Sequence, residues 1–122
     1  MPSPSAAGTY CFAVDLDEYQ RGALRTAASR DKKNELLHLV LGLVGESGEV
    51  AEKFKKWVRD LDSDETRIDR ADIAKELGDL LWYVAVLADY LDLSLDDIGA
   101  ANLAKLASRQ TRGVLGGSGD DR

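Results

Sequence analysis

The sequence contains one cysteine and two prolines in 122 residues. A single thiol, Cys11, excludes an internal disulfide and a cluster of thiolate metal ligands. Both prolines lie in the first four residues, so no proline interrupts a helix after Pro4. No signal peptide is evident, and no apolar run is long enough to span a membrane. These absences predict a soluble, cytoplasmic protein with no membrane partner.

Positive charge is also in short supply. The chain carries 16 Lys and Arg against 22 Asp and Glu, a net charge of −6. A nucleic-acid partner would require a clustered basic face, so the sequence predicts no nucleic-acid partner and favours a bound cation.

A chain of this length forms one domain and buries only about two-thirds of its unfolded surface when alone. Oligomerisation would therefore stabilise the fold by burying more apolar surface.

Ala, Leu, Glu and Lys dominate what is present, and this composition predicts an all-α fold. We expect a bundle-like protomer of four helices, at residues 15–29, 33–59, 69–91 and 96–109. Ser94 and Asp97, three residues apart, are expected to form a capping box at the start of the last helix. Residues 1–9 and 114–122 are rich in Pro, Gly and Ser and are expected to be flexible tails around a domain of residues 10–113.

The third predicted helix contains the run "LLWYVAVLA", residues 80–88, which is apolar on every side. A surface helix would show an apolar stripe instead, so this helix should be enclosed by its own domain and by a second subunit. The sequence thus predicts a homo-oligomer.

The stretch "LGLVGESGEVAEKFKK", residues 41–56, has three glycines within seven residues. It lacks the Gly-Lys-Ser/Thr of a phosphate-binding loop, and no strand precedes it. Leucine-rich helical sequence comes before it, and Glu49 with Lys53 and Glu52 with Lys56 are spaced as i,i+4 ion pairs. The stretch is therefore predicted to be helical, with glycines that permit a close approach to a ligand or a neighbouring helix.

Two pairs of acids share helical spacing. Glu46 and Glu49 lie on one face of the second predicted helix, and Glu76 and Asp79 lie on one face of the third. Either pair alone is common on solvated helices, but both lie in apolar sequence. If the helices pack antiparallel, the four carboxylates converge and require a cation between them. An all-oxygen site with no His or Cys predicts Mg²⁺, with Mn²⁺ as a second possibility.

The fourth predicted helix carries a polar row, Asn102, Lys105 and Arg109, at spacing i, i+3 and i+7. Such a row is usually solvated surface. Beside a carboxylate-bound Mg²⁺, however, it supplies the amide and cationic groups that phosphate oxygens require.

The motifs "LVGESGEVAEKFKK", "KELGDLLWYVAVLADYLDLSLDDI" and "NLAKLASR", in this order, resemble the MazG-like nucleoside triphosphate pyrophosphohydrolases of the all-α NTP pyrophosphatase superfamily. The resemblance covers residues 19–113. It implies Mg²⁺-dependent cleavage of a nucleoside triphosphate between the α and β phosphates, giving the monophosphate and pyrophosphate. Such enzymes clean the nucleotide pool and assemble as dimers or tetramers.

The resemblance also implies roles for individual residues. Glu46, Glu49, Glu76 and Asp79 correspond to the metal ligands, and Glu46 and Glu49 are the catalytic acids. Asn102, Lys105 and Arg109 correspond to the phosphate-binding row, and Tyr83 to an aromatic near the sugar or base. Many members have a further acid directly before the first ligand, where this chain has Gly45. The general base and the number of metal ions therefore stay open.

Two alternatives remain. One is a related enzyme with a dedicated substrate, such as dUTP, dCTP or phosphoribosyl-ATP, because one sequence does not reveal the preferred base. The other is a non-catalytic helical module, which four acids in apolar surroundings argue against.

Overall fold

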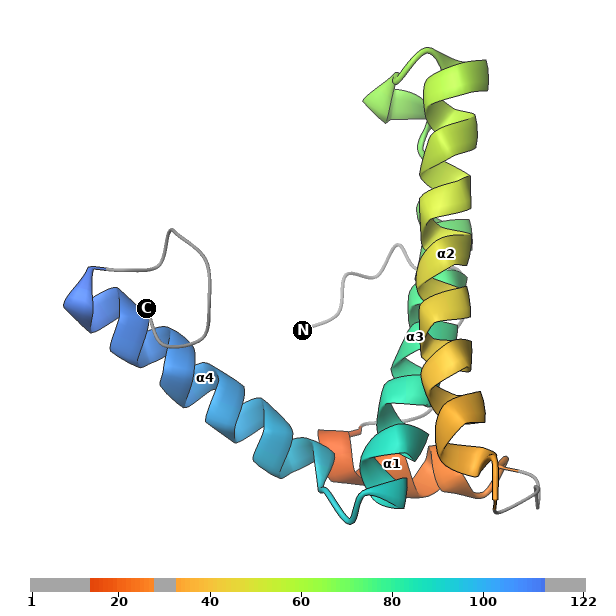
Figure 1. Cartoon of the computed structure of the whole chain (residues 1–122). Coiled ribbons are helices and arrows are strands. Elements are labelled where there is room, and N and C mark those ends of the chain that lie inside the picture. The colour runs from red at the N-terminus through yellow and green to blue at the C-terminus, as the bar shows by residue number, and fades with distance from the viewer. Residues whose placement is uncertain (1–13, 28–32, 114–122) are drawn as a thin grey trace.

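The computed structural model describes residues 14–27 and 33–113, and within them the chain is all-α with four helices and no strand (Figure 1). The helices are α1 (Leu16–Leu24), α2 (Glu35–Leu61), α3 (Arg70–Tyr90) and α4 (Leu95–Arg112), with a short 3₁₀ helix, η1 (Glu65–Arg67), between α2 and α3. The all-α prediction is confirmed, and α2, α3 and α4 begin and end within three residues of their predicted limits. The first helix was predicted to reach residue 29, but α1 ends at Leu24, where the N–H and the hydroxyl of Thr26 both donate to the Ala23 carbonyl and close a turn. Both expected tails and Cys11 lie outside the described residues.

The helices α2 and α3 form an antiparallel hairpin closed by a short connection (Figure 1). The chain leaves α2 through Asp62 and Ser63, both with positive φ, at 54° and 55°. The Asp69 carboxylate then accepts a hydrogen bond from the Asp72 N–H at 3.0 Å and caps α3. The Trp57 indole donates to the Asp64 carbonyl at 2.7 Å, which ties the connection back to α2. The closed end of the hairpin is thus fixed by side chain to backbone bonds.

Helix α1 crosses the open end of the hairpin, where the buried Gln20 joins three segments. Its Nε2 donates to the carbonyls of Ala85 at 3.1 Å and Leu93 at 3.0 Å, and its Oε1 accepts from the Leu95 N–H at 3.2 Å. A buried amide with donors and acceptor all satisfied specifies one arrangement of the parts it connects. Gln20 therefore sets how α3 turns into α4.

The turn into α4 is held by a second α1 side chain, Asp17. Its Oδ1 accepts from the Ser94 hydroxyl at 2.7 Å and from the Asp96 N–H at 3.0 Å. Ser94 in turn accepts from the Asp97 N–H at 3.2 Å, so the predicted N-cap of α4 is confirmed. From this turn α4 contacts α1 and leads away from α2 and α3 (Figure 1). The predicted bundle-like protomer is met only in part, because α4 does not close against the hairpin.

The core at this junction is small, and it consists of Ala23, Ala85, Ala88 and Leu95 with half-buried Tyr19, Trp82 and Val84 around it. Large apolar side chains are left exposed on α2, among them Leu37, Leu41 and Val44, at 58%, 60% and 62%. On α3, Leu77 is 50% exposed. The hairpin thus buries little apolar surface by itself.

Among the described residues, no helix combines the length and apolarity needed to cross a membrane.

Candidate metal centre

Three of the four predicted acids meet midway along the hairpin. Glu46 of α2 and Glu76 and Asp79 of α3 each offer a carboxylate oxygen, and these oxygens lie within 4.8 Å of one another. Antiparallel pairing of the two helices brings them together, as predicted. Oxygen-only ligand sets suit hard divalent cations such as Mg²⁺. The donor set therefore fits the predicted ion, and we call these three residues the carboxylate group.

The charges in this group act on one another. Burial raises the pKa of Glu46, and the nearby charges of Asp79, Glu76 and Glu49 raise it further. Glu49 is thus electrostatically part of the site, although its carboxylate lies outside the closest three. Carboxylates held close together without a counter-ion repel one another, which disfavours the ionised form of each. A bound cation removes this repulsion.

Lys53 forms one edge of the carboxylate group. Its Nζ lies 2.7 Å from Asp72 Oδ2 and 3.8 Å from Glu76 Oε1. The hydrogen bond with Asp72 raises the pKa of Lys53, and the same bond lowers the pKa of Asp72. The ammonium is therefore held charged across the two helices, on the side of the carboxylates toward the closed end of the hairpin.

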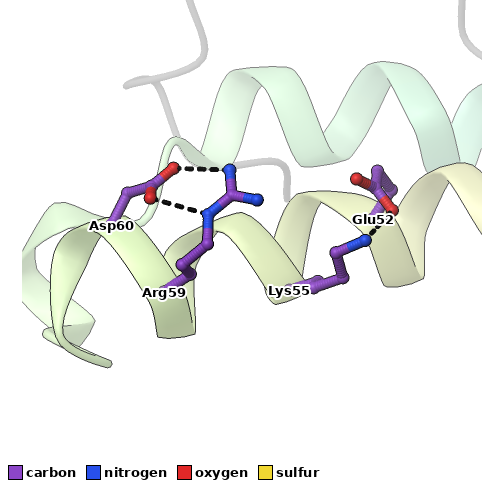
Figure 2. A network of polar contacts seen from close by, with 4 residues as sticks. All are labelled: Glu52, Lys55, Arg59 and Asp60. Carbon is purple, nitrogen blue, oxygen red and sulfur yellow. Dashed lines mark hydrogen bonds and ion pairs between the residues drawn. The ribbon is translucent and has the colours of Figure 1, made fainter.

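The predicted i,i+4 ion pairs along α2 are not the ones formed. Lys53 pairs with α3, and Glu52 pairs with Lys55 at 3.2 Å (Figure 2). In the next turn Arg59 holds Asp60 through two hydrogen bonds of 2.8 and 3.0 Å (Figure 2). The sequence prediction was wrong here because the acids of α3 compete for Lys53, and shorter-range partners exist for Glu52.

Gly42 permits the predicted close approach. A Cβ at this position would overlap the ring of Tyr83, which also packs edge-to-face with Trp82 at 5.0 Å between ring centroids. At Gly45 and Gly48 an added Cβ would meet no atom within 4 Å. The expected close approach is therefore found at Gly42, whereas an added Cβ at Gly45 or Gly48 would point into open space.

The polar row of α4 is not brought to the carboxylate group within one chain, because α4 leads away from α2 and α3 (Figure 1). Along the row Asn102 is exposed, Lys105 is half-buried and Arg109 is only 4% exposed. Arg109 is therefore not a solvated surface residue, as members of such a row usually are. A buried guanidinium requires partners that compensate its charge.

A cavity of about 320 Å³ lies at the closed end of the hairpin, next to Lys53. Neither the cavity nor the roles of Lys53 and Asp72 follow from the two acid pairs alone. Tyr19 was also missed: burial, followed by the charge of Asp79, raises the pKa of its phenol. The sequence does contain one indication that Asp72 belongs to the site. Asp72 precedes Glu76 by four residues and therefore extends the acidic face of α3 by one turn.

Comparison with known proteins gives a consistent result. Residues 34–114 match the MazG nucleotide pyrophosphohydrolase domain, and this segment contains all four predicted acids. The chain is 46% identical over 114 residues to the Gene 37 protein of Mycobacterium phage L5, covering 89% of this chain and 100% of that protein. No solved structure matches the chain. The extent of the domain match and of this identity shows that the chain belongs to the MazG nucleotide pyrophosphohydrolase family.

Proposed function

We propose that this protein hydrolyses nucleoside triphosphates between the α and β phosphates, yielding a nucleoside monophosphate and pyrophosphate, in clearance of unwanted nucleotides. The observation that carries the proposal is the convergence of Glu46, Glu76 and Asp79 from two helices, within 4.8 Å. Family membership supports the reaction class.

Glu46, Glu76 and Asp79 would hold Mg²⁺, with Glu49 beside them as the fourth acid. When bound, the ion supplies Lewis-acid polarisation of phosphate oxygens and offsets the charge on the departing pyrophosphate. The chain contributes positioning: Lys53, held by Asp72 at 2.7 Å, keeps a fixed positive charge at one edge of the site. Glu46 and Glu49 are the proposed catalytic acids, which is the role that the resemblance to the family implies for them.

We further propose that a second copy of the chain completes the site. Asn102, Lys105 and Arg109 are the proposed phosphate-binding residues, yet their helix leads away from the carboxylates of its own chain. The exposed Leu37, Leu41 and Val44 of α2 offer the apolar surface that a homodimer or homotetramer would cover. A helix α4 supplied by the partner would bring the row to the site.

The deciding experiment is a panel of canonical and modified nucleoside triphosphates with Mg²⁺, in which pyrophosphate and orthophosphate are measured separately. Pyrophosphate and a monophosphate are the expected first products. Orthophosphate as the first product would contradict cleavage between the α and β phosphates. Excess chelator should abolish turnover, and activity that persists in chelator would contradict the metal centre.

The same panel separates a broad enzyme from one dedicated to a single nucleotide. A preference of 100-fold or more in kcat/KM for one base, about 2.7 kcal/mol, would indicate a dedicated substrate. No turnover of any nucleotide would favour the non-catalytic alternative.

A further inference from the structure

The cavity at the closed end of the hairpin has the size of a small-ligand site. Its volume of about 320 Å³ falls in the range of about 300–1,000 Å³ that is usual for such sites. The residues that matter for its chemistry are Lys53, Phe54, Trp57, Arg67, Ile68 and Asp72. Aromatic and aliphatic side chains form its walls, with charged groups among them.

The aromatic wall of the cavity is fixed in place. The rings of Phe54 and Trp57 pack edge-to-face, with centroids 5.9 Å apart. The bond from the Trp57 indole to the Asp64 carbonyl holds the larger ring against rotation. Phe54 is 37% exposed, and Trp57 is half-buried. Held, incompletely covered aromatic faces are the surfaces on which nucleobases stack.

The cavity and the carboxylate group are connected through Lys53. Lys53 lines the cavity, and its Nζ lies 3.8 Å from Glu76 Oε1. Asp72 lines it as well and holds Lys53 at 2.7 Å. A ligand with an anionic, cation-binding end and a flat aromatic end could therefore occupy both places at once. A nucleotide has these two ends.

The other direction along the hairpin is less open. Tyr83 lies one helical turn beyond Asp79, away from Lys53, where the resemblance to the family implies an aromatic near the sugar or base. One side of its ring is covered by Gly42, and Trp82 packs edge-to-face with it. Tyr83 is thus engaged by its own protomer, whereas the Phe54–Trp57 wall borders a cavity.

We propose that this cavity binds the base and sugar of a nucleotide whose phosphates lie at the carboxylate group. The inference rests on the proposed function for the position of the phosphates. It assigns Trp57 and Phe54 to base stacking and makes the cavity the place where the preferred base is selected.

Fluorescence tests the proposal directly, since the chain has two tryptophans. In Trp82→Phe, Trp57 is the only indole, and the matched variant Trp57→Phe leaves only Trp82. Each is titrated, with Mg²⁺, with an α,β-methylene nucleoside triphosphate, a nucleoside monophosphate and pyrophosphate. Both nucleotides should quench Trp57 saturably, while pyrophosphate should not. Saturable quenching of Trp82 alone, or of neither indole, would overturn the proposal.

A cavity-filling variant gives a second, kinetic test. Ile68→Phe should raise KM for the triphosphate about fivefold or more and leave the inhibition constant of pyrophosphate unchanged. Val58→Phe, on an exposed part of α2 outside the cavity, is the matched control. An unchanged KM, or equal rises in both constants, would overturn the proposal. Failure of the proposed function looks different: no pyrophosphate is released by wild type, whatever the Trp57 signal shows.

Discussion

The ring of Tyr83 lies against Gly42, and a side chain at position 42 would overlap it. We expect Gly42→Ala to lower the free energy of unfolding by about 1–3 kcal/mol, because the ring or the helices must move. Alanine has a higher helix propensity than glycine by about 1 kcal/mol. A decrease in stability would therefore come from the overlap with Tyr83 and not from helix propensity. Urea denaturation measures the change. Gly45→Ala, where a Cβ meets nothing within 4 Å, is the matched control and should not destabilise.

Removing one charge from the carboxylate group should separate stability from activity. Glu46→Gln should raise the melting temperature of the metal-free protein, since burial and three neighbouring acids disfavour the charged form of Glu46. The same change should weaken Mg²⁺ binding and lower turnover by about 100-fold or more. Calorimetric titration with Mg²⁺ and thermal melts in chelator measure both. Glu52→Gln, which removes an acid paired with Lys55, should change neither.

Gln20 should be costly to replace, because its side chain satisfies two carbonyls and one N–H in a buried position. Gln20→Ala should reduce the free energy of unfolding by about 3 kcal/mol, since each buried group left without a partner costs about 1–3 kcal/mol. Hydrogen exchange at the start of α4 should accelerate as well. The exposed neighbour substitution Arg21→Ala should stay within about 0.5 kcal/mol. Equal stability of the two variants would contradict the role given to Gln20.

Asp17 should make stability depend on acid pH. The bonds from the Asp96 N–H and the Ser94 hydroxyl lower its pKa below the ordinary value of 3.8. Its ionised form therefore stabilises the fold above that value, and this contribution is lost as the pH falls through the lower, folded-state pKa. Melting curves from pH 6 to about pH 2.5 should converge for wild type and Asp17→Asn at the acid end. In a Ser94→Ala background the difference between the two should shrink.

Mixing two inactive variants tests whether α4 acts across subunits. If a second copy supplies the row, Glu46→Gln and Lys105→Ala chains should form a mixed dimer with one intact site and one doubly defective site. Random exchange would then restore about a quarter of wild-type activity. Separate samples at the same total concentration are the control. No recovery after confirmed subunit exchange would place both residues in the site of one chain.

Local signals predicted the helices and the carboxylate group well. Ser94 marked the start of α4, and the absence of proline after Pro4 permitted the 27 residues of α2. Glu46 needed only helical spacing and antiparallel packing to face Glu76 and Asp79, whereas Glu49, the fourth predicted acid, lies outside the closest three. Such features depend on neighbours in the sequence, which a single chain reveals.

Contacts between distant segments were not predictable in this way. The course of α4 is set by Gln20 and Asp17, whose partners lie more than 60 residues further along the chain. Nothing in the α1 sequence marks these two polar side chains as different from solvated ones. Lys53 likewise had a plausible partner in Glu49, and only the packing of α3 shows that Asp72 is nearer.

The closed end of the hairpin also bears on the order of folding. The carboxylates meet through one short connection, so the loop that must close to bring them together is small and its entropic cost modest. Docking of α1 requires contacts of much greater sequence separation and should come later. The acids then repel one another at the first pairing of α2 with α3, before any other helix is in place. A divalent cation should therefore speed refolding as well as stabilise the final state, as stopped-flow refolding in Mg²⁺ and in chelator would show.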